Sequence, residues 1–403
     1  MGGRITDTGV EQYYDDELVV DLVHLGAVTN LIDAWAGTGR PAWVRRDDEA
    51  GSALLGLAWI EVAGLKAVAG TLRGRAELVA RAGRHRKGPV EDLDLLLHAL
   101  REERPEFVIG KHRLVENVEG TSVPRNAPAG MRLERRGPTE HPRVRVGVLG
   151  TPIWPHDQLA GRFMADSDAL LPRVREAPTP MLAGHATFVA GIIAAHAPDA
   201  ELVVRAGLDE GAVCADSWEV ATRMVGFGAE EVDLLQLSFA CFTADDEPPL
   251  VVERAVARLR EQAVLVAAAG NHAAEPGARR HAKAFPAACE GVVAVGTEAE
   301  FSPKAPWVAL HAPGTGVTST YLEGRVSLPK GEEAHYCGAA TWSGTSFAAA
   351  AVSGAIAGLA HRRGSSAREA KEYLLHRPEV RDIHPPEAVK EDVSAAPAPP
   401  PYR

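Results

Sequence analysis

The chain has 403 residues, of which 46% are hydrophobic and 24% charged, so its composition is that of a globular protein and excludes a wholly disordered chain. This length exceeds what one hydrophobic core usually organises, which predicts a large domain and a smaller one. The formal net charge of −11 argues against nucleic acid or an anionic membrane surface as the main partner.

The first twenty residues contain no basic segment followed by an apolar one, and no uncharged apolar run could span a bilayer, so we expect a cytoplasmic protein without a membrane partner. The four cysteines, Cys214, Cys241, Cys289 and Cys337, form no C-x-x-C pair and have no histidines at ligand spacing. They are interpreted as small buried hydrophobic residues. We also find no acidic loop of the calcium-binding type, so no metal or cofactor is expected.

Residues 1–120 are predicted to form a small α/β or α+β domain of unknown role. Strand-like apolar runs occur at residues 18–22 and 54–60. Residues 92–103 predict a helix, because leucines recur there at i, i+3, i+4 and i+7 and form one apolar stripe: Leu93, Leu96, Leu97 and Leu100.

Residues 121–142 are rich in Gly, Pro and charge without an apolar period, which is typical of a linker. A second domain is predicted over residues 143–375, where short apolar runs alternate with Ala-rich helical patterns. This alternation favours a parallel sheet with helices on both faces, and such sheets carry their chemistry at the carboxyl ends of the strands. Residues 376–403 form a Pro-rich tail that we expect to be disordered.

Three segments of the second domain carry polar residues at strand ends or helix starts. His185 lies in AGHATFVAGIIAA, Asn271 ends VLVAAAGN, and Ser346 lies in ATWSGTSFAAAA. Each alone has an ordinary structural interpretation as a histidine near a helix start, a turn residue and an N-cap serine. Together they supply a nucleophile, a base and an oxyanion donor.

These segments resemble the motifs of the subtilisin-like (S8) serine proteases, in the same order along the chain. GHATFVAGI is similar to the histidine motif of that family, SGTSFAAAAVSG to its serine motif, and VAAAGN to the segment that carries its oxyanion asparagine. The resemblance implies a subtilisin-like fold that acts on protein or peptide substrates. It makes Ser346 the nucleophile, His185 the general base and later acid, and the Asn271 amide with the Ser346 N–H the oxyanion hole.

The segment VDLLQLSFA is similar to the strand of the family that lines the substrate cleft, which places Ser238, Phe239 and Ala240 along bound peptide. This chain departs from the family pattern at three positions: Ala186 and Ala240 replace glycines, and Ala350 replaces a helix-kinking proline. A methyl group at Ala240 is expected to narrow the specificity pocket.

A fourth departure concerns the catalytic triad itself. The family's first strand ends with the aspartate that orients the histidine, and VGVLGTP puts Gly150 at that position. Glycine offers neither charge nor a side-chain acceptor. Asp157, Asp166 and Asp168 follow in the sequence and are weighed as substitute acids, and the Thr151 hydroxyl as a substitute acceptor, although Asp157 is better explained as the cap of a turn.

Two functions from different classes therefore remain open. One is a serine endopeptidase attenuated by the loss of its acid, and the other is an inactive pseudoprotease that binds peptides or proteins. Retention of the serine, histidine and asparagine favours the enzyme, because a binding module needs none of them. A nucleotide-binding turn at VGVLGTP is disfavoured, because the segment lacks G-x-G-x-x-G. The N-terminal domain is expected either to inhibit the cleft as a regulatory contact within the chain or to act as an adaptor.

Overall fold

The structure is a computed structural model that describes most of the chain. The described residues are 4–82, 90–118, 120–127, 133, 143–173, 175–211 and 213–376. The expected Pro-rich tail lies outside them, except for its first residue, and so does most of the expected linker.

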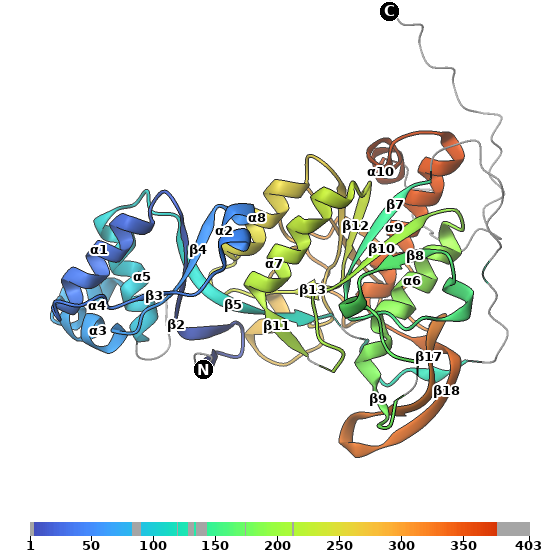
Figure 1. The fold of residues 1–403 in the computed structure, drawn as a ribbon, viewed down its shortest axis with the longest axis horizontal. Helices are drawn as coiled ribbons and strands as arrows, with labels where there is room; N and C mark the ends of the chain where they lie inside the picture. Colours follow the sequence, from blue (N-terminus) through green and yellow to red (C-terminus); the bar gives the residue numbers. More distant parts are fainter. Residues whose placement is uncertain are drawn as a thin grey trace, which may run out of the picture.

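The second domain is built on a parallel sheet of seven strands, as the sequence predicts (Figure 1). Every pairing in this sheet is parallel. The central strand β7 runs between β12 and β10 and carries small and β-branched residues that are buried on both faces. In spatial order the strands are β16 (Leu310–His311), β15 (Val292–Gly296), β14 (Val264–Ala268), β12 (Leu234–Leu237), β7 (Arg145–Gly150), β10 (Glu201–Ala206) and β8 (Phe163–Ala165).

Helices cover both faces of this sheet, which confirms the expected layers. Side chains of β7 alternate between two cores: Val146 and Val148 pack with α6 and α9, whereas Leu149 packs with α7 and α8. The first face carries α6 (His185–His196), α9 (Thr345–Arg363) and α10 (Ala367–Leu375), and the second carries α7 (Ser217–Gly226) and α8 (Leu250–Leu259). Figure 1 shows the two layers on either side of the strands.

The N-terminal unit is an antiparallel sheet with its own helical layer. Its strands are β1 (Ile5–Asp7), β2 (Gln12–Asp21), β3 (Val44–Arg45), β4 (Leu57–Glu61) and β5 (Ile109–Asn117), and its helices are α1 (Leu25–Ala36), α2 (Glu49–Leu55), α3 (Leu65–Arg73), α4 (Ala76–Ala82) and α5 (Asp92–Glu103). One face of the sheet packs on the unit's own helices through Leu18 and Ile60. The other face packs on α7 and α8 through Val19 and Val115. The sheet therefore lies between two helical layers.

Two expectations for this unit have different outcomes. The helix over residues 92–103 is confirmed as α5, and its predicted leucine stripe is buried. The apolar run at 54–60 is only partly a strand, because Leu54 and Leu55 close helix α2 and β4 begins at Leu57. The Asp48 side chain caps that helix by accepting from the Gly51 N–H, and Gly56, with a φ of +67°, ends it.

Strand β5 joins the N-terminal unit to the second domain. Beyond its pairing with β2 it pairs antiparallel with β11 (Cys214–Asp216) and with β13 (Phe239–Ala240). The chain then enters β6 (Arg125–Asn126), inside the expected linker, and β6 pairs with the long hairpin strand β18 (Glu333–Trp342). β18 pairs with β17 (Val317–Ser327), which in turn pairs with β9 (Thr179–Pro180).

A buried charged contact also holds the N-terminal unit against the second domain. His112 on β5 is fully buried between Glu17, at 2.6 Å from Nδ1, and Asp216, at 3.0 Å from Nε2. Burial lowers the pKa of His112, but hydrogen bonds to Asp216 and Glu17 outweigh it and raise the pKa above its ordinary value. The imidazole therefore links a carboxylate of each unit.

In the part of the chain that the structure describes, no helix is both long and apolar enough to cross a membrane. Cys241 and Cys289 are buried, as expected, but Cys214 is half-buried and Cys337 is exposed. Cys337 lies on the hairpin strand β18, where alternate side chains face away from the core, so its interpretation as a buried residue was wrong.

Candidate active site

The central strand of the parallel sheet ends at Gly150 with room for a side chain. A Cβ at this position would lie 3.8 Å from its nearest neighbour, the methyl group of Ala186, which is ordinary van der Waals contact. The next residue, Thr151, is buried, and its hydroxyl accepts a hydrogen bond of 3.2 Å from the Ala186 N–H. The threonine hydroxyl therefore anchors the first turn of α6 to the strand.

His185 is the first residue of α6 and is 1% exposed. Neither ring nitrogen has a hydrogen-bond partner among the residues that the structure describes. The ring lies between aromatic neighbours, with centroids 6.0 Å from Trp342 and 5.7 Å from Phe347. Burial lowers the pKa of His185 from 6.5 to about 4, and the backbone of Val118 opposes this shift only weakly. The imidazole is therefore neutral at neutral pH, the form that a general base requires.

This burial predicts a loss of stability in mild acid. The pKa of His185 and that of His272 are both lowered from 6.5 to about 4 in the folded protein, mainly by burial. Since the unfolded chain binds these protons first, folding stability is retained above pH 6.5 and lost as the pH falls toward 4, by on the order of 3 kcal/mol for each histidine. Urea unfolding between pH 7 and 4 measures this loss, and the loss should be smaller in His272→Gln by on the order of 3 kcal/mol, because one buried histidine is removed. An equal loss of folding stability in wild type and His272→Gln would contradict the lowered pKa of His272.

Ser346 is the second residue of α9 and is fully buried. Its hydroxyl donates a hydrogen bond to the carbonyl oxygen of Val118, which follows the last residue of β5. The backbone of Val118 also raises the pKa of His185, against the effect of burial. The structure therefore brings the serine and the histidine, 161 positions apart by their numbers, to one backbone group of the N-terminal unit.

The strand at Ser238–Ala240 is paired with backbone of the N-terminal unit. The Val118 N–H donates to the Ser238 carbonyl at 2.9 Å, and in β13 Phe239 lies opposite Asn117 and Ala240 opposite Glu116. Antiparallel addition of a strand to a sheet edge is a common mode of peptide recognition. The three residues expected along bound peptide are thus already paired with residues 116–118 of the chain itself.

The chain continues beyond Val118 across the start of α9. The Thr121 N–H donates to the Ser343 carbonyl at 2.9 Å, and the indole of Trp342 donates to the Ser122 carbonyl. Gly120 sits so close to this indole that a Cβ would lie 1.8 Å from Nε1 of Trp342. Residues 117–118 and 120–122, hereafter the cleft segment, therefore lie across the site, and residue 119 is outside the described part. Sequence reasoning missed this segment, because ENVEG carries no local signal of where it lies.

Asn271 lies after β14, next to the start of α9. Its side-chain oxygen accepts a hydrogen bond of 2.9 Å from the Thr345 N–H. Gly270, with a φ of +95°, turns the chain at this point. Asn271 therefore lies at the start of the helix whose second residue is Ser346.

The carboxylates considered as substitutes are engaged elsewhere. Asp157 is exposed and pairs with Arg173 at 2.8 Å, which lowers the pKa of Asp157. Asp166 pairs with Arg205 and Asp168 with Arg223. Nor does Asp157 cap its turn as expected, because the N-cap of that 3₁₀ turn is His156, whose ring accepts from the Gln158 N–H. Among the described residues, no carboxylate contributes to the pKa of His185.

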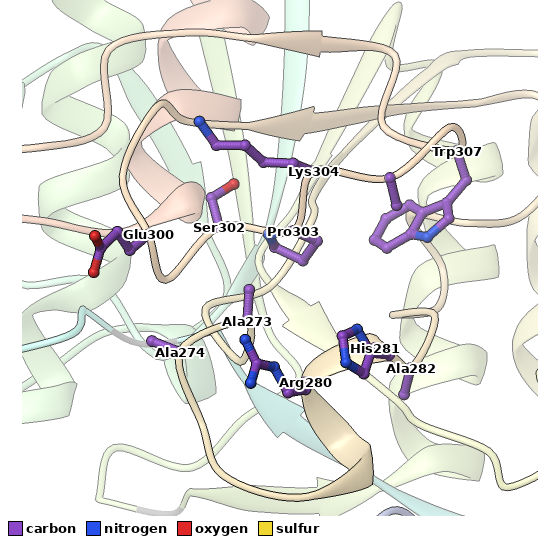
Figure 2. A pocket seen from close by; sticks show the side chains of 11 residues that line it. Ala273, Ala274, Arg280, His281, Ala282, Glu300, Ser302, Pro303, Lys304 and Trp307 are labelled. Carbon is purple, nitrogen blue, oxygen red and sulfur yellow. The ribbon is translucent and has the colours of Figure 1, made fainter.

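A cavity of about 600 Å³ is lined by Ala273 and Ala274, which follow the asparagine segment, but not by Asn271 itself. Figure 2 shows Arg280 and His281 on one side of it, facing Lys304 and Glu300 on the other. It is not lined by His185 or Ser346. In the described part of the chain, no three His, Cys, Asp or Glu side chains are grouped to hold a metal ion.

Comparison with known proteins gives a family match over most of the second domain. A sequence model of the subtilase family matches residues 142–383. The minor extracellular protease Epr of Bacillus subtilis (strain 168) is 31% identical over 204 residues, which are 44% of this chain and 28% of that protein. The chain thus spans little more than a quarter of this relative.

Among solved structures, fervidolysin from Fervidobacterium pennivorans, a keratinolytic enzyme related to subtilisin, is similar to most of the chain. The TM-score is 0.55 at 16% identity, covering 90% of this chain and 56% of that one. A lanthipeptide protease is 24% identical with a TM-score of 0.45, over 57% of this chain and 78% of its own. At 16% identity the likeness to fervidolysin concerns the fold alone, and it confirms the fold expected from the sequence motifs.

Proposed function

The chain belongs to the subtilase family, and from that premise we propose that it is a serine endopeptidase whose turnover is attenuated by the glycine at position 150. The observation that carries the proposal is the hydrogen bond from the Ser346 hydroxyl to the carbonyl of Val118, in a strand paired as a bound peptide would be. A nucleophile, a base and a peptide carbonyl meet there.

In the proposed reaction, Ser346 Oγ attacks the carbonyl carbon of the residue that occupies the Val118 position. His185 takes the hydroxyl proton, and the Asn271 amide and the N–H groups at the start of α9 stabilise the oxyanion. Collapse of the tetrahedral intermediate breaks the C–N bond, and His185 gives its proton to the leaving amine. Water then attacks the acyl-enzyme by the same route, which releases the acid and restores Ser346.

Attenuation follows from the surroundings of His185. The imidazolium formed during attack has no carboxylate beside it, and its burial disfavours the positive charge, as its lowered pKa records. In subtilisin, removal of the triad aspartate alone lowers kcat by about 3 × 10⁴. We propose a loss of similar size here.

The N-terminal unit is proposed as a regulatory partner within the same chain. Ser346 is fully buried with its hydroxyl bonded to the cleft segment, whose backbone pairs with the strand that substrate would use. A second, exogenous peptide cannot pair with Ser238–Ala240 until the cleft segment moves away. Access to the serine is therefore limited by local opening of the chain.

The second candidate is a pseudoprotease that binds peptides without turnover. It is favoured by one observation: among the described residues no carboxylate contributes to the pKa of His185, so no acid orients the imidazole or stabilises its protonated form. A pure binding module, however, gains nothing from a serine, a histidine and an asparagine gathered at one helix start.

A fluorophosphonate probe distinguishes the two candidates. We expect slow covalent labelling of the full chain, followed by intact-mass spectrometry, and complete loss of labelling in Ser346→Ala because the nucleophile is gone. Asp157→Asn is the matched control and should label at the wild-type rate, since Asp157 pairs with Arg173 at the surface. An inert wild-type chain would favour the pseudoprotease, and slower labelling of Asp157→Asn would restore that residue as the acid.

A further inference from the structure

The cleft segment and the end of β5 indicate which positions of a substrate the cleft would contact, because they lie in the register of a bound peptide. Val118 presents its carbonyl to Ser346, so the reacting bond of a substrate would follow the residue at this position. Asn117 is held by its N–H to the Val213 carbonyl at 2.8 Å. Glu116, two positions before the reacting carbonyl, is paired with Ala240 on one side and Cys214 on the other.

The side chain of Glu116 meets a cation supplied by the second domain. Its carboxylate forms an ion pair with Arg279, and the two side chains are only 19% and 20% exposed. Arg279 belongs to a 3₁₀ turn, Ala278–His281, that follows the asparagine segment. Two other charged residues of β5, Lys111 and Arg113, are paired within the N-terminal unit, where both contact Glu11.

Two neighbours hold the guanidinium of Arg279 in place. It stacks over the ring of Phe242, at 4.3 Å from the centroid, and its Nε lies 3.6 Å from Glu275. Stacking on an aromatic face orients the planar guanidinium and shields it from water, which strengthens a charge-assisted bond to a carboxylate. Both neighbours belong to the second domain, so the cation remains in position when the cleft segment leaves.

We infer that Arg279 is a specificity-determining residue that selects peptides with an acidic side chain two positions before the residue whose carbonyl is attacked. This inference rests on the proposed function, since it concerns the same cleft. If the ion pair served only to fasten the N-terminal unit, a separate peptide would show no preference at that position. The inference requires that the protein prefer a peptide with an acidic residue at that position. It also requires that the preference reverse when the charge at residue 279 is reversed.

The test uses two fluorescein-labelled peptides and the full chain. One peptide has the sequence of residues 114–121, and the other carries lysine at the position of Glu116. Binding is measured by anisotropy and cleavage by mass spectrometry, in wild type, Arg279→Glu and the control Arg280→Glu, an exposed arginine on the same turn. Comparing the two peptides within one variant cancels the competition from the cleft segment, because that competition is the same for both.

We expect the acidic peptide to bind wild type and Arg280→Glu about tenfold or more tightly than the lysine peptide, and Arg279→Glu to reverse the preference. Equal binding of the two peptides in wild type, no binding of either, or an unchanged preference in Arg279→Glu would overturn the inference. Preferential binding without any cleavage would instead contradict the proposed enzyme while leaving the role of Arg279 supported. Equal affinity for the two peptides, with both cleaved at equal rates, would support the proposed enzyme and overturn the role of Arg279.

Discussion

Gly150→Asp is expected to raise peptidase activity by about four orders of magnitude. The position lies at the end of β7, beside the first turn of α6, and has space for a side chain because the nearest atom to a Cβ would be 3.8 Å away. A carboxylate there would hold the imidazole tautomer and stabilise the imidazolium, which is worth about 3 × 10⁴ in subtilisin. By the tenfold-per-1.36 rule this corresponds to roughly 6 kcal/mol of transition-state stabilisation. Hydrolysis of an unfolded protein substrate measures the change.

The control for this gain is Gly150→Asn, which has nearly the same shape without the charge. Because an amide cannot stabilise a neighbouring imidazolium in the same way, Gly150→Asn should remain within about tenfold of wild type. Ser346→Ala in the Gly150→Asp background should abolish the gain. If Gly150→Asp folds with wild-type thermal stability and its activity is unchanged, the histidine does not occupy the position that the triad requires.

Gly120→Ala is expected to uncover Ser346. A methyl group at this position would lie 1.8 Å from Nε1 and 2.1 Å from Cε2 of Trp342, which is itself 1% exposed and cannot move aside easily. Overpacking of this kind costs about 1–3 kcal/mol, which corresponds to a roughly 5- to 150-fold increase in the population with the cleft segment displaced. Fluorophosphonate labelling of Ser346 should accelerate by that factor.

Hydrogen exchange provides the structural readout for the same variant. The amides of Asn117 and Val118, which are bonded to the carbonyls of Val213 and Ser238, should exchange faster when the cleft segment opens. Gly70→Ala is the matched control, since a Cβ at Gly70 on α3 would meet no other atom within 4 Å. Faster exchange of these two amides in both variants, or in neither, would mean that Gly120 does not hold the cleft segment over the serine.

The parts of the structure that the sequence predicts are those with local or motif-level signals. The leucine stripe of α5 identifies a helix, and alternating apolar and Ala-rich runs identify a covered parallel sheet. His185, Asn271 and Ser346 lie in three separate motifs, and the order of these motifs along the chain predicts the subtilisin-like fold. Gly150 stands out in the sequence because a strand ends there without the expected acid.

The parts that could not be predicted depend on pairing between distant segments. Val118 reaches Ser346 only because β5 also pairs with β11 and β13 of the second domain, and no residue of the cleft segment signals this locally. The ion pair between Glu116 and Arg279 has the same origin, since it joins residues of different units. The end of helix α2 was predicted as a strand, because Asp48 and Gly56 set the limits of this helix and no apolar period marks them.

The central claim is that Gly150, His185 and Ser346 belong to one site that lacks only its acid. The most direct test is the pH profile of fluorophosphonate labelling in wild type and in Gly150→Asp. A carboxylate beside the imidazole would raise the pKa of His185, so the acid limb of the profile is predicted to move to higher pH in the variant, with a higher plateau. Identical midpoints in two folded proteins that both label Ser346 would contradict the claim.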